Sequence, residues 1–186
     1  MKQTVALRIG RSALVTALAG GAVLTGVAPA ANAAPAITAA SAASAASAAQ
    51  TLGPFGYGRI KLGMSEAQAR ATGLVVRKKI KAPTTCSTYD LKAHRYGGDR
   101  AGLFISKKRG VVTISAPGAV KTPQGIGRGS TPAQLKAAYP KLKQSALYGT
   151  PIVPVPGNPK ASYVFLVSKR MVVGVVLILT AQDCLR

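Results

Sequence analysis

A twelve-residue stretch that occurs twice constrains the fold of this chain more than any other feature. The first copy covers residues 60–71 and the second covers residues 126–137. At a constant offset of 66 residues, five positions are identical: Ile60/Ile126, Gly63/Gly129, Ala67/Ala133, Gln68/Gln134 and Ala71/Ala137. Self-similarity at a fixed offset is typical of an internal duplication in which each copy forms one structural unit. The duplication bears on architecture and not on activity.

Each copy carries the signature of a helix start. Ser65 and Gln68 in the first copy, and Thr131 and Gln134 in the second, have the spacing of a capping box. In that motif the hydroxyl accepts from a backbone N–H three residues on, and the Gln side chain accepts from the N–H of the cap residue. A glycine before each cap allows a sharp turn. Each copy therefore predicts an extended segment, a glycine turn and a short capped helix.

The first 33 residues predict a secretion signal. Lys2, Arg8 and Arg11 form a positive segment, residues 13–27 are apolar, and residues 31–33 (Ala-Asn-Ala) form a small-x-small cleavage site. The alternative is a membrane anchor, but the apolar run is interrupted by glycines and is shorter than the ~20 residues that span a bilayer. We therefore expect an extracellular or cell-wall-associated protein with no transmembrane segment in the mature chain.

An Ala/Ser-rich segment, residues 34–51, separates the signal from the folded part. It has no charge and no large side chain except at its end, so it predicts a flexible leader. Residues 52–186 are long enough for one domain with its own core. Removal of residues 1–33 leaves 22 basic and four acidic residues, which is a net charge of +18.

Two β-hairpins are predicted, one after each helix. The first joins residues 101–106 to 111–116, where apolar and polar residues alternate. The second joins residues 162–167 to 171–179, and its last strand is apolar on both faces, which is typical of a central strand. The sequence thus predicts an α+β domain of two helix-plus-antiparallel-sheet repeats, at about 57–118 and 123–186.

The repeated motif resembles that of a known family. The first copy has the order Ile60-x-Leu62-Gly63-Met64-Ser65-x-x-Gln68, and a short helix and antiparallel strands are expected after each copy. This pattern, used twice, is similar to the tandem-repeat β-lactamase-inhibitor-protein fold and to the related single-repeat outer-membrane assembly lipoproteins. The matching residues of the second copy are Ile126, Gly129, Ser130, Thr131 and Gln134. The resemblance implies a protein that binds a partner through its sheet. Its usual disulfide in each repeat and aromatic-rich sheet do not match two Cys and no Trp, so we do not expect β-lactamase inhibition.

Cys86 and Cys184 are the only cysteines. An even number in an exported chain predicts a disulfide. A reactive thiol is the alternative, but it would need a base such as His94, and nothing near that residue in sequence supports such a pair.

Few residues could support catalysis or metal binding. The chain has one histidine, His94, and four acidic residues, so we predict no metal site, no cofactor and no catalytic site. Tyr89, Asp90 and His94 are the one polar cluster, and surface residues between strands explain it better. The glycines at 125, 127 and 129 could offer N–H groups to an anion, but a turn is the simpler explanation. We therefore predict a protein that is not an enzyme.

Positive charge is the strongest functional signal. Three segments supply the candidate anion-binding residues: Arg77, Lys78, Lys79 and Lys81; Lys107, Lys108 and Arg109; and Lys169 and Arg170. Basic turns also discourage strand pairing at hairpin edges, but that does not explain the net charge. If the repeats are related by a rotation, we expect the two basic hairpin turns to share one rim.

We therefore expect a secreted binding protein that attaches to an anionic envelope polymer or an acidic protein. The alternative is a protein inhibitor or assembly factor that binds a partner protein through its sheet face. The few aromatic residues argue against specific nucleic-acid recognition. The sequence leaves the oligomeric state and the identity of the partner open.

Overall fold

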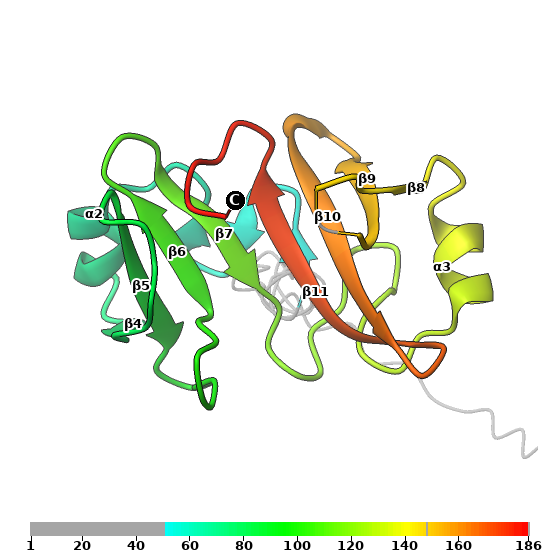
Figure 1. The fold of residues 1–186 in the computed structure, drawn as a ribbon, viewed down its shortest axis with the longest axis horizontal. Coiled ribbons are helices and arrows are strands. Elements are labelled where there is room, and N and C mark those ends of the chain that lie inside the picture. The colour runs from blue at the N-terminus through cyan, green and yellow to red at the C-terminus, as the bar shows by residue number, and fades with distance from the viewer. Residues whose placement is uncertain (1–50, 148, 186) are drawn as a thin grey trace, which may run out of the picture. The chain divides into compact units, whose positions relative to one another are not determined.

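The computed structural model describes residues 51–147 and 149–185, and strands predominate in it (Figure 1). The predicted signal and residues 34–50 of the predicted leader lie outside the described residues. The elements in chain order are β1 (Leu52–Gly53), β2 (Gly56–Tyr57), β3 (Ile60–Lys61), α2 (Glu66–Ala71), β4 (Val75–Arg77), β5 (Cys86–Leu91), β6 (Leu103–Ser106), β7 (Gly110–Ser115), α3 (Pro132–Ala138), β8 (Lys143–Gln144), β9 (Pro151–Val155), β10 (Asn158–Ser168) and β11 (Met171–Leu179). The chain is therefore an α+β fold with two short helices in its described part.

An eight-stranded antiparallel sheet forms the body of the domain. Its order is β4-β5-β6-β7-β11-β10-β9-β8, so the earlier four strands lie on one side and the later four on the other. β7 and β11 meet in the middle, with Ile114 opposite Leu177. The expectation that the last apolar strand is central is confirmed, because β11 lies between β7 and β10. A separate three-stranded sheet has the order β1-β2-β3.

Both predicted capping boxes are present. The Ser65 hydroxyl accepts from the Gln68 N–H at 3.2 Å, and the Gln68 side chain accepts from the Ser65 N–H at 2.9 Å. Thr131 and Gln134 make the same pair of bonds at 3.2 and 2.9 Å. The residues of the repeated motif therefore cap the N-terminus of each helix, as the motif predicts.

The glycine turn before each helix binds to a strand of the large sheet. The Gly63 N–H donates to the Val111 carbonyl oxygen at 2.9 Å, and the Val111 N–H donates to the Met64 carbonyl oxygen at 2.7 Å. Gly129 and Ser130 make the same two bonds to Val172, each at 2.8 Å. These bonds fix the start of α2 against β7 and the start of α3 against β11.

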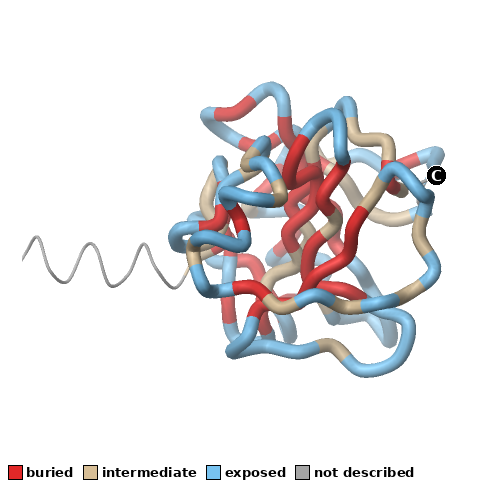
Figure 2. The backbone as a smooth tube through the Cα atoms, turned by 90° about the vertical axis from the view of Figure 1, so that its left-hand side faces the viewer, coloured by how far each residue is buried: buried red, intermediate tan, exposed pale blue. Residues whose placement is uncertain are grey.

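The hydrophobic core lies between one face of the large sheet and the helices with the small sheet. Ala69 of α2 and Leu135 of α3 pack into the same cluster as Ile114 and Leu177. Tyr139 and Phe165 have ring centroids 5.3 Å apart within it. Figure 2 shows that buried residues concentrate in the strands through the middle of the domain, whereas the connections are mostly exposed. We call the opposite face of the large sheet the outer face.

The predicted disulfide is confirmed. Cys86 at the start of β5 is bonded to Cys184, which follows β11, and the bond joins residues 98 apart in sequence. The Ser106 hydroxyl donates to Asp183 at 3.0 Å beside it. Together these contacts hold the segment after β11 against β5 and β6. Neither helix in the described part is long and apolar enough to cross a membrane.

Candidate functional site

The two basic hairpin turns lie at opposite ends of the large sheet. The first, 107–109, joins β6 to β7 and lies near Asp183, as the Ser106 contact shows. The second, 169–170, joins β10 to β11 at the end where Gly129 meets Val172. Because β7 and β11 are antiparallel, the turns are separated by roughly 30 Å of strand. The expectation of one shared rim is therefore wrong.

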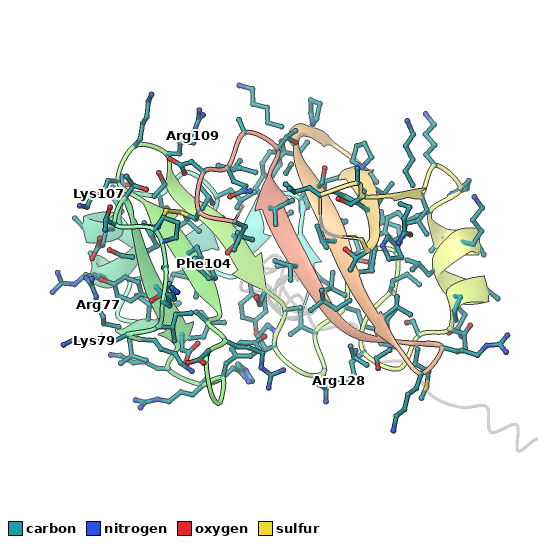
Figure 3. The ribbon with its side chains drawn as sticks, viewed as in Figure 1. Arg77, Lys79, Phe104, Lys107, Arg109 and Arg128 are labelled. Atoms are coloured by element: carbon teal, nitrogen blue, oxygen red, sulfur yellow. A yellow bond between two sulfur atoms is a disulfide. The ribbon has the colours of Figure 1, made fainter. Side chains whose placement is uncertain are left out.

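The basic segment after β4 lies near the first turn instead. The Lys107 N–H donates to the Thr85 carbonyl oxygen at 2.9 Å, which brings the β4–β5 connection to the β6–β7 turn. Arg77, Lys79, Lys107 and Arg109 accordingly lie on the same side of the domain (Figure 3). The structure thus places these four candidates on one side of the domain and puts Lys169 and Arg170 at the other end of the strands.

Two of the nine candidates are engaged within the protein. Arg77 forms an ion pair with Glu66 at 3.0 Å. Lys78 pairs with Asp90 at 3.5 Å, and both side chains of that pair are largely buried. The hydroxyl of Tyr89 also donates to Glu66 at 2.5 Å, and this hydrogen bond, more than the nearby arginines, holds the pKa of Glu66 below its usual value. Lys78 is therefore occupied within the fold, whereas Arg77, whose side chain is 57% exposed, remains accessible to a partner.

Tyr89, Asp90 and His94 do not form one polar cluster, and the expectation that they are surface residues is wrong for Tyr89 and Asp90, which are 2% and 3% exposed. Adjacent residues of β5 point to opposite faces, so Tyr89 contacts Glu66 while Asp90 contacts Lys78.

The glycines at 125, 127 and 129 form turns, which agrees with the simpler of the two explanations given for them. The N–H groups of all three glycines donate to oxygen atoms of the protein. Within the described residues, the group of three potential metal ligands comprises Cys86, Asp183 and Cys184, whose sulfurs form the disulfide.

The outer face carries a cleft that the sequence did not indicate. Its volume is about 430 Å³. The connection 92–102, between β5 and β6, forms one wall, and the connection after β7 and the β10–β11 hairpin form the other. Strands β6, β7 and β11 supply its floor, including Phe104 and Val176. The cleft is therefore built from segments that are far apart in sequence.

Arginines line the rim of this cleft. Arg95 and Arg100 belong to the first wall and Arg128 to the second, while the lining residues include no lysine. The Arg128 Nε donates to the Val173 carbonyl oxygen at 3.3 Å. The Arg100 guanidinium carbon lies 6.0 Å from the centre of the Tyr96 ring. One acidic residue, Asp99, also lines the cleft. Figure 3 shows Arg128 at the lower edge of the domain, near the β10–β11 turn.

Asp90 holds the first wall in place. Its carboxylate accepts from the Gly102 N–H at 2.8 Å and from the Tyr96 N–H at 3.1 Å. The Lys78 ammonium donates to the Tyr96 carbonyl oxygen as well as pairing with Asp90. The Tyr96 hydroxyl donates to the Ala116 carbonyl oxygen at 3.0 Å, and burial raises the pKa of this phenol. A buried carboxylate thus fixes the conformation of the wall that presents Arg95 and Arg100.

Apolar side chains are exposed next to the arginines. Leu166 is 42% exposed and Val173 is 40% exposed, and both line the cleft. Met171, at the start of β11, is 48% exposed. The cleft therefore combines an accessible apolar surface with a positive rim. No family model, curated protein or solved structure matches this chain.

Proposed function

We propose that this protein is an exported, non-enzymatic binding protein that attaches to an anionic partner, most simply an envelope polymer. The observation that carries the proposal is the excess of cations without a carboxylate partner. Without residues 1–33, the chain has 22 Lys and Arg against four Asp and Glu. Among the described residues, only Arg77 and Lys78 form ion pairs with a carboxylate.

The arrangement of the charge favours a long polymer over a compact anion. The basic turns 107–109 and 169–170 lie at opposite ends of the sheet, roughly 30 Å apart along the strands. This exceeds the Debye length of about 8 Å at physiological ionic strength, so the two turns act independently. A flexible polyanion can contact both turns and release condensed counterions at each.

Retention on immobilised heparin or teichoic acid tests the proposal. One variant replaces Lys107, Lys108, Arg109, Lys169 and Arg170 with Ser. The matched control replaces five exposed cations elsewhere with Ser: Arg70, Lys92, Lys141, Lys143 and Lys160. We expect affinity to fall steeply with salt and both variants to lose similar affinity, because the charge is distributed. If the wild type is not retained at physiological salt, or neither variant weakens binding, the proposal fails.

We further propose that the domain consists of two helix-plus-sheet repeats, as in the β-lactamase-inhibitor-protein family that the motif resembles. The order of the large sheet supports this proposal, because it reads β4 to β7 from one edge and β8 to β11 from the other. The equivalent bonds of Gly63 to Val111 and of Gly129 to Val172 also support it. A separately expressed fragment of residues 52–118 would test whether one repeat folds alone.

A second candidate function is binding of a partner protein through the outer face. The exposed Leu166, Met171 and Val173 favour it, because exposed apolar side chains that lie together often mark an interaction surface. Replacing Leu166 and Val173 with Ser distinguishes the two functions. This change should leave polymer retention intact, since it removes no charge, whereas it should abolish binding of a partner that docks on this face.

A further inference from the structure

We propose that the outer-face cleft binds a small amphipathic anion, namely a carboxylate with an extended apolar chain. Nothing in this proposal depends on attachment to a polymer. The cleft volume of about 430 Å³ falls within the range of pockets that hold small organic ligands. Its mainly apolar floor and its rim of arginines match the two parts of such a molecule.

Apolar side chains of the floor and of the second wall offer contacts to the apolar chain, with Thr113 and Ser115 of β7 lying opposite Phe104 and Val176. Phe104 of β6, Val176 of β11 and Leu166 of β10 all line the cleft. The 42% exposure of Leu166 and the 40% exposure of Val173 leave apolar surface in contact with water. A ligand chain lying on this floor would remove that surface from water and stabilise the complex.

The rim is suited to a carboxylate. The cleft is lined by three arginines, one histidine (His94) and no lysine, although lysines outnumber arginines in the described chain. A guanidinium binds a carboxylate through two parallel hydrogen bonds, whereas an ammonium acts as a point charge. The Arg128 Nε is held by the Val173 carbonyl oxygen, so this guanidinium is fixed beside the apolar floor. Its two terminal nitrogens make no hydrogen bond to another described residue.

Opposite walls supply the guanidiniums. Arg100 stands over the Tyr96 ring, in the wall that Asp90 fixes, and Arg128 stands on the facing wall. Asp99 is the opposing charge in the cleft, and no described cation pairs with it. The formal charge of the arginines still exceeds that of Asp99 by two, so the cleft attracts an anion and repels a cation.

Isothermal titration calorimetry with dodecanoate, below its micelle concentration, tests the proposal on the domain with its disulfide intact. We expect saturable one-to-one binding that butyrate and dodecyltrimethylammonium do not reproduce. Arg100→Gln with Arg128→Gln should weaken dodecanoate affinity about tenfold or more, as expected for loss of charge-assisted hydrogen bonds. Asp99→Asn should tighten it, because it removes the opposing charge.

The matched control is Arg70→Gln with Arg109→Gln, which removes the same charge from α2 and from the β6–β7 turn. This pair should change the affinity less than about threefold, given screening over the intervening distance. Equal loss in both pairs, equal binding of the cationic amphiphile, or no saturable binding would each overturn the proposal. Heparin retention is measured in parallel. Loss of dodecanoate binding with heparin retention intact would overturn only the cleft proposal. Dodecanoate binding without heparin retention would overturn only the polymer proposal.

Discussion

A Cβ atom added to Gly110 would lie 2.4 Å from the carbonyl oxygen of Gly63. Gly110 begins β7 and has a φ of 71°, in the left-handed region that favours glycine. The Gly63–Met64 turn lies directly against it, since Met64 accepts a hydrogen bond from Val111. The glycine at the start of β7 therefore allows the turn before α2 to pack against the large sheet.

We expect Gly110→Ala to destabilise the fold by about 2–4 kcal/mol, because backbone strain adds to a clash with main-chain atoms. Gly63→Ala is the control. Gly63 has a similar φ of 81°, but a Cβ atom there meets nothing within 4 Å. That change should cost only about 1 kcal/mol. Equal denaturation midpoints in urea for the two variants would show that the close approach is unimportant.

The capping boxes give a second expectation. Ser65→Ala and Thr131→Ala should each lower the free energy of unfolding by about 1 kcal/mol, since each leaves a helix N–H without its acceptor. Replacing each cap with Asp should restore most of the loss, because Asp caps as well as Ser does. Chemical denaturation measures both effects. Unchanged midpoints in both alanine variants would contradict this explanation of the repeated motif.

Asp90 gives a third expectation. Asp90→Ala should destabilise the protein by about 3 kcal/mol, because it leaves the largely buried Lys78 without a counter-charge. It should also speed hydrogen exchange at the Gly102 and Tyr96 amides, which donate to Asp90. Asp90→Asn, which keeps one acceptor oxygen, should have a smaller effect. Normal protection of the Gly102 amide in the alanine variant would show that Asp90 does not hold the wall.

Tyr139 gives an expectation about pH. It is 3% exposed, and burial raises its pKa from 10.0 to about 12. The folded state therefore favours the protonated phenol more than the unfolded state does. The contribution of this phenol to the free energy of unfolding is fully present below about pH 10 and is lost as the pH rises from about 10 toward 12. Denaturation at pH 9 and pH 11 should show a smaller loss for Tyr139→Phe than for the wild type. Equal losses would mean that this phenol does not control alkaline stability.

The parts of the fold that were correctly predicted have local signals. A capping box is complete within four residues, and an apolar strand such as 171–179 indicates central burial without knowledge of its neighbours. The disulfide followed from the presence of only Cys86 and Cys184. In each case the prediction needed only the residues of one segment or the number of cysteines in the chain.

The cleft and the placement of the turns depend on long-range pairing. Arg100, Arg128 and Val173 come together only because β7 pairs with β11, and no periodicity links them in sequence. The same antiparallel pairing sends the two hairpin turns to opposite ends, which is why one shared rim was wrongly expected. Asp90 looked like a surface residue because its partners, Lys78 and Gly102, become neighbours only in the sheet.

The position of β11 has a consequence for the order in which the chain can assemble. Val176 is synthesised 61 residues after Ser115, its partner on β7. Until then β7 has a bare edge whose backbone groups can pair with any extended chain, including a second nascent copy. We therefore expect that interruption of synthesis before residue 171 would release a fragment prone to aggregate.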